Sequence, residues 1–382
     1  MTPSDDTDLS DVRVAVSRPS SSSGTDPYLR DGPRIQTPDP IVVVPVTDEL
    51  LDTHTGLNVR RFLQTAVAIA ADNDGRVLLL GIETVPNEAA LETVRRSVNT
   101  EQPIDDETTT AVKTVRERQT QLAEVANVAR GLSPGVRISA AVRIVLDVTE
   151  GIMDVLGEED ETAVLLLRGT GLDEGWLLQR STIERILADA ECDVFVENLG
   201  VRGGENALYV PDVAEHTVAS LAESDVGTID SILVPVGAGP HAALATEAAR
   251  AIARYTDASV TVLHVISPDA SVEVRAESED LLEFADYVLG SRVRTETVLR
   301  EASNTTDTIV QEAKKHDFVA IGAPEKKSRL EQLVFQSARE TISDLSEATI
   351  LMAHDSDQTM RSLYYRWKRG IEAIDNENEP NN

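Results

Sequence analysis

The clearest pattern of hydrophobic and polar positions lies between residues 231 and 266. Residues 232–236 form a short apolar run rich in β-branched side chains, which predicts a strand buried on both faces. Residues 237–240 read Gly-Ala-Gly-Pro, and this sequence ends the strand. Small apolar residues then recur at helical spacing, and a second apolar run occupies residues 260–266. We therefore predict a parallel strand–helix–strand unit with a right-handed crossover.

A second copy of this pattern lies upstream. Residues 41–46 match the first strand and share its Val-Pro-Val, residues 59–71 supply a helix, and residues 77–82 supply the second strand. A repeat on this scale is too long for a solenoid unit and fits a duplicated domain.

The alternation continues along both halves of the chain. We expect further strands at 136–145, 162–167, 192–196, 292–299, 318–322 and 348–352. We expect helices at 88–96, 108–130, 148–156, 181–187, 277–289, 305–315 and 333–345, and the stretch between the halves allows a strand at 207–210 and a helix at 213–222. Ser181 and Glu184 form a capping-box pattern at the start of one of these helices. Five strands alternating with helices, twice, predict an α/β protein with two doubly wound, parallel, five-stranded, Rossmann-like sheets in tandem.

Changes in composition set the predicted boundaries. We expect a disordered, acidic and Ser-rich tail at 1–38, a first domain at 39–200, a linker at 201–228, a second domain at 229–355 and a C-terminal tail at 356–382. Residues 363–369 are the basic, aromatic part of that last tail. They predict either a short helix that folds back onto its own acidic domain or a docking peptide for a partner or an anionic membrane surface.

The net charge and the cysteine content bear on the cellular environment in which the protein works. The formal net charge is -31, from 66 acidic and 35 basic residues. One interpretation is an acidic mimic of nucleic acid, and we favour the other, a cytoplasmic protein of a salt-loaded cell, where salt screens like charges. Such a surface repels phosphates, so we expect no nucleic-acid partner. The single cysteine, Cys192, excludes an intrachain disulfide and is expected to be a small buried hydrophobe. No apolar run of membrane-spanning length and no signal region is visible, so we expect a soluble, cytoplasmic protein.

Candidate chemistry is expected beyond the carboxyl ends of the strands, where doubly wound sheets bind ligands. Glycines there let backbone N–H groups approach a phosphate, and a helix N-terminus adds positive potential. His241 could contact a ligand or could simply begin a helix. No metal-ligand spacing, nucleophile elbow, P-loop or dinucleotide fingerprint is present, which argues against a redox or hydrolytic enzyme. The predicted ligand-contacting residues are Asp48, Gly169, Gly171, Ser181, Gly237, Gly239, His241, Gly322, Gln336 and Ser337.

The two halves, roughly residues 39–200 and 229–355, resemble tandem universal stress protein domains. The resemblance lies in the opening Ile-Leu-Val-Pro-Val strand, the Ala-rich helix after it, and the Val-Leu-His-Val of residues 262–265. It also includes Asp-Phe-Val-Ala-Ile-Gly at 317–322, and the closing Ser-Ala-Arg-Glu-Thr-Ile at 337–342 with Ala-Thr-Ile-Leu-Met at 348–352. The Gly-Pro-His at 239–241 is similar to stress-protein-like domains associated with transporters in salt-loving archaea.

The resemblance implies a nucleotide pocket, but its key residues depart from the family pattern. The ATP-binding branch has Gly-x-x-Gly, nine residues, then Gly-Ser or Gly-Thr, and an Asp just after the first strand. In the second domain Glu325 stands at the second glycine, Gln336-Ser337 replaces Gly-Ser one position late, and Gly237 replaces the Asp. The first domain keeps Asp48 and Ser181, but Arg180 precedes that serine and the spacing from Gly171 is too short.

The expected function is therefore a non-enzymatic regulator or sensor with degenerate nucleotide sites and no required cofactor. Its partner would be a small molecule or a protein, for which a membrane transporter is one candidate. The resemblance also implies that the two domains pack as an intramolecular pseudo-dimer, and a homodimer is a further assembly. The alternative is an ATP-binding universal stress protein with slow ATPase activity.

Overall fold

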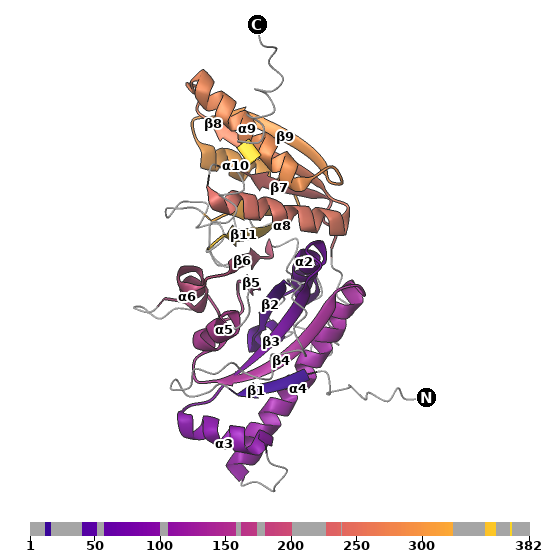
Figure 1. Cartoon of the computed structure of the whole chain (residues 1–382), viewed down its shortest axis with the longest axis vertical. Coiled ribbons are helices and arrows are strands. Elements are labelled where there is room, and N and C mark those ends of the chain that lie inside the picture. The colour runs from indigo at the N-terminus through magenta and orange to yellow at the C-terminus, as the bar shows by residue number, and fades with distance from the viewer. Residues whose placement is uncertain are drawn as a thin grey trace, which may run out of the picture. The chain divides into compact units, whose positions relative to one another are not determined.

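The computed structural model describes residues 12–16, 40–51, 57–99, 106–157, 162–173, 180–200, 227–237, 239–323, 348–356 and 367–368 (Figure 1). Its contacts divide the chain into two compact units. Unit 1 comprises Met1–Cys192 with Asn206–Asp225, and unit 2 comprises Asp193–Glu205 with Val226–Asn382.

Unit 1 is built on a parallel sheet with the strand order β1-β4-β3-β2-β5. Its strands are β1 (Val12–Val16), β2 (Ile41–Val46), β3 (Arg76–Thr84), β4 (Arg137–Val145) and β5 (Thr162–Leu167). Its helices are α1 (Asp48–Leu51), α2 (Val59–Asp72), α3 (Glu88–Asn99), α4 (Asp106–Leu132), α5 (Val148–Leu156) and α6 (Thr182–Asp189).

The core of unit 1 forms around β2. All six residues of β2 are buried, as expected for a central strand covered on both faces. The helix α2 is capped by Asn58, the residue before its start, whose side chain accepts a hydrogen bond from the Arg61 N–H (3.0 Å). Phe62, Leu63 and Ala66 of α2 are fully buried and lie in its apolar stripe.

The strand β1 corrects the expectation of a disordered tail over residues 1–38. It pairs in parallel with β4, with Val12 opposite Ala140 and Val16 opposite Ile144. Its sequence, Val-Arg-Val-Ala-Val, alternates β-branched residues, which suits a strand. The residues on either side are rich in Ser and Asp, so a prediction based on composition misses a strand of only five residues.

Unit 2 is built on a sheet with the strand order β6-β11-β10-β7-β8-β9. Its strands are β6 (Asp193–Asn198), β7 (Ser231–Pro235), β8 (Ser259–Ile266), β9 (Arg294–Glu301), β10 (Phe318–Gly322) and β11 (Thr349–His354). Its helices are α8 (Pro240–Thr256), α9 (Val272–Leu289) and α10 (Thr305–Ala313).

The strand β6 is found where the fifth strand of the first domain is predicted, and the division by contacts groups it with unit 2. It runs antiparallel to β11, from Ile350 opposite Asn198 to His354 opposite Val194. The Thr349 hydroxyl also donates to the Leu199 carbonyl (2.8 Å). The other pairings in this sheet are parallel. The antiparallel pairing of β6 with β11 joins segments far apart in the chain and was not predicted from the sequence.

The two units share one strand order. β4-β3-β2-β5 in unit 1 corresponds to β9-β8-β7-β10 in unit 2. In unit 1 the chain adds β3 and β4 on one side of β2 and then returns to place β5 on its other side. In unit 2 it adds β8 and β9 on one side of β7 and then places β10 on the other. The returning right-handed crossover places its helix on the opposite face of the sheet. The predicted α/β, doubly wound class is therefore confirmed.

Most predicted elements are found within a few residues of their expected bounds. The helix expected at 277–289 is longer, because Ser271 caps it by accepting a hydrogen bond from the Val274 N–H (3.3 Å). The elements expected at 207–210, 213–222 and 333–345 lie outside the described residues. No helix within the described part of the chain is both long and apolar enough to cross a membrane.

The first prediction concerns Asp317, which ties the start of β10 to the start of β7. Its Oδ2 accepts hydrogen bonds from the Asp230 N–H (3.1 Å), the Ser231 N–H (3.1 Å) and the Ser231 hydroxyl (2.8 Å). Asp317→Ala should lower the free energy of unfolding by about 2 kcal/mol, because these bonds to a charged acceptor are lost. The control is Asp286→Ala, which removes an exposed carboxylate on α9. Equal unfolding midpoints for the two variants would contradict the prediction.

Candidate functional site

In each unit the strand order reverses between two neighbouring strands. These are β2 and β5 in unit 1 and β7 and β10 in unit 2. Ligands of open parallel sheets bind beyond the carboxyl ends of such a pair. The predicted residues that lie at these ends are Asp48, Gly169, Gly171, Gly237 and Gly322.

The loops that follow β2 and β5 are joined by buried hydroxyl groups. The Thr47 hydroxyl donates to the Thr170 carbonyl (2.9 Å), and the Thr170 hydroxyl donates to the Leu167 carbonyl (2.6 Å). The Leu50 N–H in turn donates to the Thr47 hydroxyl oxygen (3.4 Å). The predicted glycines after β5 are thus held against the start of α1.

Gly171 packs against the side chain of Glu49. Its φ is +75°, a left-handed conformation that favours glycine. A Cβ built on Gly171 would lie 3.0 Å from Glu49 Oε1 and 3.1 Å from Oε2. The carboxylate therefore occupies the approach that an anionic group would need, and its charge repels phosphate.

Gly169, the other predicted glycine of this loop, has its amide already bound. Its N–H donates to Asp173 Oδ1 (3.1 Å), and Asp173 Oδ2 lies 3.0 Å from Arg168 Nη2. Burial lowers the pKa of Arg168, and the nearby Asp173 and Glu184 act in the opposite direction. The loop thus supplies its own carboxylate to the amide and to the arginine.

Asp48 belongs to a charged cluster that the sequence analysis did not identify. Its carboxylate pairs with Arg118 of α4, whose Nη2 also lies 3.5 Å from Glu83 Oε2 at the end of β3. The Arg118 side chain is only 4% exposed, whereas that of Asp48 is 81% exposed. Arg118 lies between the buried Val115 and Leu122 at helical spacing. A charged residue within the apolar stripe of α4 was the feature of the sequence that could have indicated this cluster.

The pKa of Glu83 in this cluster is shifted from its ordinary value. Burial raises its pKa, the Arg118 charge and hydrogen bond lower it, and the Asp48 charge raises it; the net direction is upward. Arg118 keeps two buried nitrogens, Nε and Nη1, without a hydrogen-bond partner among the described residues. With Glu49 nearby in the chain, carboxylates outnumber the one arginine, which disfavours a triphosphate.

Ser181 is used by the protein itself. Its hydroxyl oxygen accepts a hydrogen bond from the Glu184 N–H (3.2 Å), while its own N–H donates to Glu184 Oε2 (3.1 Å). The predicted capping box is confirmed, and Ser181 is buried at the start of α6. A ligand role for Ser181 stays a prediction.

In unit 2, Gly322 lies directly against the start of α8. A Cβ built on it would lie 2.6 Å from the Ala242 nitrogen and 2.7 Å from the His241 carbonyl carbon. Only glycine allows this approach, so the glycine at the end of β10 serves packing. By contrast, no described atom lies within 4 Å of a Cβ built on Gly237 or on Gly239, which caps α8.

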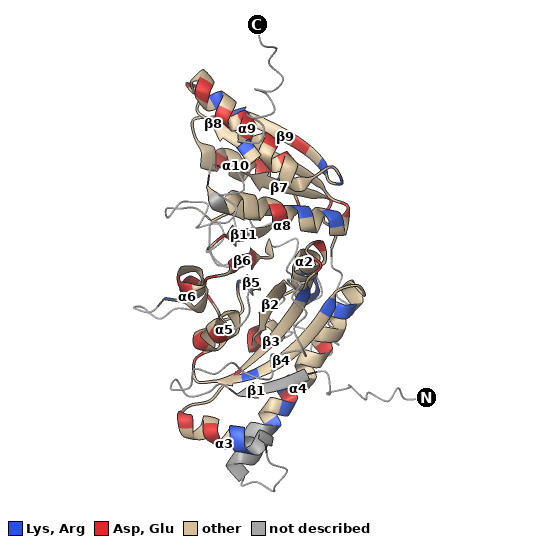
Figure 2. Cartoon of the chain, viewed as in Figure 1, with Lys and Arg blue, Asp and Glu red and all other residues tan. Residues whose placement is uncertain are grey.

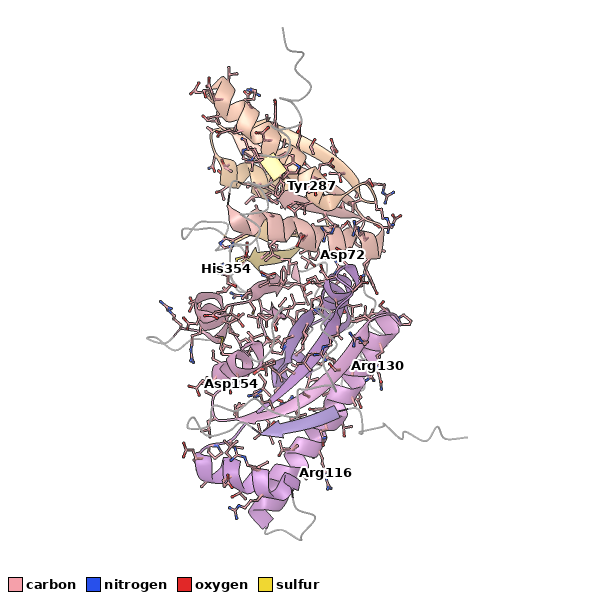
Figure 3. The ribbon with its side chains drawn as sticks, viewed as in Figure 1. Asp72, Arg116, Arg130, Asp154, Tyr287 and His354 are labelled. Atoms are coloured by element: carbon pink, nitrogen blue, oxygen red, sulfur yellow. The ribbon has the colours of Figure 1, made fainter. Side chains whose placement is uncertain are left out.

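His241 links the start of α8 to the end of β11. Its ring stacks on His354 with a centroid separation of 4.5 Å, and its Nδ1 accepts the Asp355 N–H (3.0 Å). Burial lowers the pKa of His354, which Figure 3 labels at the end of β11. These contacts fit an anchor at the helix start, and a ligand contact by His241 stays a prediction.

Of the other predicted residues, Gln336 and Ser337 lie outside the described residues. His264 of β8 lies with its Nδ1 2.7 Å from the Val236 carbonyl oxygen. Across the described ranges, no group of three or more His, Cys, Asp or Glu side chains could hold a metal ion.

Comparisons with known proteins bear mainly on unit 2. Residues 228–354 match the family model described as the universal stress protein family. No curated protein matches the chain.

Three solved structures are similar to this chain at low identity. A universal stress protein from Archaeoglobus fulgidus DSM 4304 is 14% identical, with 82% of this chain and 95% of that chain covered and a TM-score of 0.45. The cytoplasmic domain of a prokaryotic cation chloride cotransporter is 13% identical, with 85% and 99% covered and a TM-score of 0.44. A putative universal stress protein from Pseudomonas aeruginosa UCBPP-PA14 is 15% identical, with 86% and 97% covered and a TM-score of 0.40.

The second prediction tests the contact between Gly322 and α8. Gly322→Ala should lower the free energy of unfolding by about 2 kcal/mol, because the new methyl group overlaps backbone atoms that cannot rotate away. Gly237→Ala is the matched control, since its methyl group meets no described atom. Thermal unfolding of both variants measures the difference, and an unchanged midpoint for Gly322→Ala would contradict the close contact.

The third prediction concerns pH. Because the pKa of Glu83 is raised in the folded protein, the folded state keeps this proton to a higher pH than the unfolded chain does. The free energy of unfolding therefore falls as pH rises through the window between 4.5, the ordinary value, and the raised pKa. Glu83→Gln removes this titration and should keep the stability that the wild type loses there.

Urea unfolding across this window measures the effect. Glu117→Gln is the control, because it removes one exposed carboxylate from α4 and so makes the same change in net charge. Parallel pH profiles for the wild type and Glu83→Gln would show that Glu83 is not perturbed.

Proposed function

We propose that this chain is a non-enzymatic regulator or sensor of the universal stress protein type, with degenerate nucleotide sites. The family match of residues 228–354 supports the type for unit 2. The strand order that unit 1 shares with it supports a second domain of the same kind, and hence a tandem arrangement.

One observation carries the proposal. In both units a glycine at the strand-order reversal packs against the chain itself: Gly171 against the Glu49 carboxylate and Gly322 against the backbone of His241 and Ala242. A phosphate needs both the space above such a glycine and a free amide. Here the space is taken, and in unit 1 the Gly169 amide already binds Asp173.

A second candidate function is ATP binding with slow hydrolysis. It is favoured by the open space above Gly237 and Gly239, which immediately precede α8. Backbone N–H groups at a helix start can bind phosphate, and no side chain caps this one. This alternative requires unit 2, not unit 1, to hold the nucleotide.

Three expectations from the sequence remain proposals. They are a transporter as partner, an intramolecular pseudo-dimer of the two domains, and adaptation to a salt-loaded cell. The net charge of -31 supports the third, because dissolved salt screens the repulsion among carboxylates. Figure 2 shows positions of Asp and Glu, coloured red, on helices of both units.

The fourth prediction tests the nucleotide sites directly. In equilibrium dialysis against labelled ATP in molar KCl, the wild type should retain no nucleotide at millimolar concentration. Glu49→Ala removes the carboxylate beside Gly171 and should raise retention above that of Glu150→Ala, an exposed control with the same change in charge.

The outcomes separate the candidates. ATP retained by the wild type and lost in Gly237→Ala would establish the second candidate in unit 2 and overturn the first. Equal retention by Glu49→Ala and Glu150→Ala would show that Glu49 is not what excludes nucleotide from unit 1.

A further inference from the structure

Three exposed apolar side chains lie on α9. Among the described residues, three of the four large hydrophobic side chains that are exposed lie on this helix: Val272 (80%), Val274 (45%) and Tyr287 (61%). The helix is also strongly acidic, with six carboxylates and one arginine (Figure 2). Val272 and Val274 lie in the first turn of α9 and Tyr287 in its last, so they do not form one patch, and the surface described next is the one around Tyr287.

Trp367 packs on part of this surface. Its ring centroid lies 5.4 Å from that of Phe284 and 6.5 Å from that of Tyr287, both in tilted arrangements. Trp367 also packs against a buried cluster in which Phe284 and Val288 of α9 meet Ala243 of α8. The indole therefore covers the apolar seam between two helices of unit 2, next to the labelled Tyr287 in Figure 3.

Lys368 adds a charged contact beside the ring. Its Nζ lies 2.8 Å from Asp280 Oδ2, and both side chains are partly buried. Asp280, Phe284 and Tyr287 follow one another at spacings of four and three residues, so they lie along one face of α9. We call these three residues the α9 stripe.

We propose that the α9 stripe is a docking surface for a basic segment that carries a tryptophan, and that Trp367 and Lys368 of the same chain occupy it. Charge complementarity supports this occupant, because residues 364–369, Tyr-Tyr-Arg-Trp-Lys-Arg, are a concentrated basic and aromatic stretch in an acidic chain. Each residue of the segment makes one kind of contact: the Trp367 ring packs on Phe284 and Tyr287, and the Lys368 ammonium group pairs with Asp280. This proposal does not depend on what binds at the carboxyl ends of the central strands.

The physical character of the contact fits concentrated salt. Salt screens the ion pair between Lys368 and Asp280, whereas contact between apolar rings does not depend on charge. The aromatic part of the contact should therefore persist in molar KCl. Because occupant and surface belong to one chain, a free segment must compete with a high effective concentration of the tethered one.

The first experiment follows Trp367 in the full-length protein. Trp176→Phe removes the only other tryptophan, and acrylamide quenching then measures the exposure of Trp367. Quenching should be at least about twofold weaker than in a free peptide of residues 361–372, because the ring is covered by α9. Phe284→Ala should raise quenching toward the peptide value, and Val272→Ala, on the same helix, should not.

Asp280→Lys changes a partly exposed side chain and should leave the fold intact, so a change in quenching would report on the contact with Lys368. It should raise quenching at low salt and have less effect in molar KCl. Glu279→Lys makes the same charge change one position along the helix, which turns it away from the α9 stripe, and should leave quenching unchanged. Peptide-like quenching in the parent protein, or equal effects of the two lysine variants, would overturn the proposal.

The second experiment tests recognition in trans. A fluorescent peptide of residues 361–372 should bind the full-length Trp367→Ala variant about tenfold or more tightly than it binds the wild type, whose own segment competes. No binding to Trp367→Ala, or equal binding to both proteins, would contradict a docking surface. Two results together would instead identify a membrane as the partner. Trp367 would bind vesicles of anionic lipid at a physiological ratio of lipid to protein, and α9 would not protect Trp367 from acrylamide when vesicles are absent.

Discussion

Close approach of the chain to its own glycines at the carboxyl ends of the central strands is the constraint on which the rest depends. In a doubly wound sheet, these positions are where the backbone can come nearest to a ligand. Here Gly322 admits the start of α8, and Gly171 admits the Glu49 carboxylate. The same lack of a side chain that would serve a phosphate thus serves packing within the protein.

The two units fill this space in different ways, and the difference has consequences. In unit 1 the group beside the glycine is a carboxylate at the end of a rotatable side chain. In unit 2 it is backbone, fixed further by the stacking of His241 on His354 and by the bond from the Asp355 N–H. One substitution can therefore open the first site, whereas the second is closed by the path of the chain. The open side of this strand end lies at Gly237 and Gly239, where a built Cβ meets no described atom.

The sequence predicts the elements well where a local physical signal is strong. The fully buried β2 is a β-branched apolar run, and the capping box of Ser181 and Glu184 marks the start of α6. It fails where pairing between distant segments decides. The five residues of β1 become a strand through their pairing with β4, and the antiparallel pairing of β6 with β11 cannot be predicted from the residues of either strand. The candidate sites divide in the same way: glycines at strand ends are visible in the sequence, but Glu49 reaches Gly171, and Arg118 reaches Asp48, only in three dimensions.

The position of the Glu49 carboxylate is the most direct test of the central claim. A crystal structure of the wild type, grown in high salt and soaked with millimolar ATP and Mg²⁺, would observe it. We predict that the Glu49 carboxylate contacts Gly171 and that Gly322 contacts the backbone of Ala242, with no nucleotide beyond either pair of strands. A triphosphate seated beside Gly171, with Glu49 turned away, would contradict it.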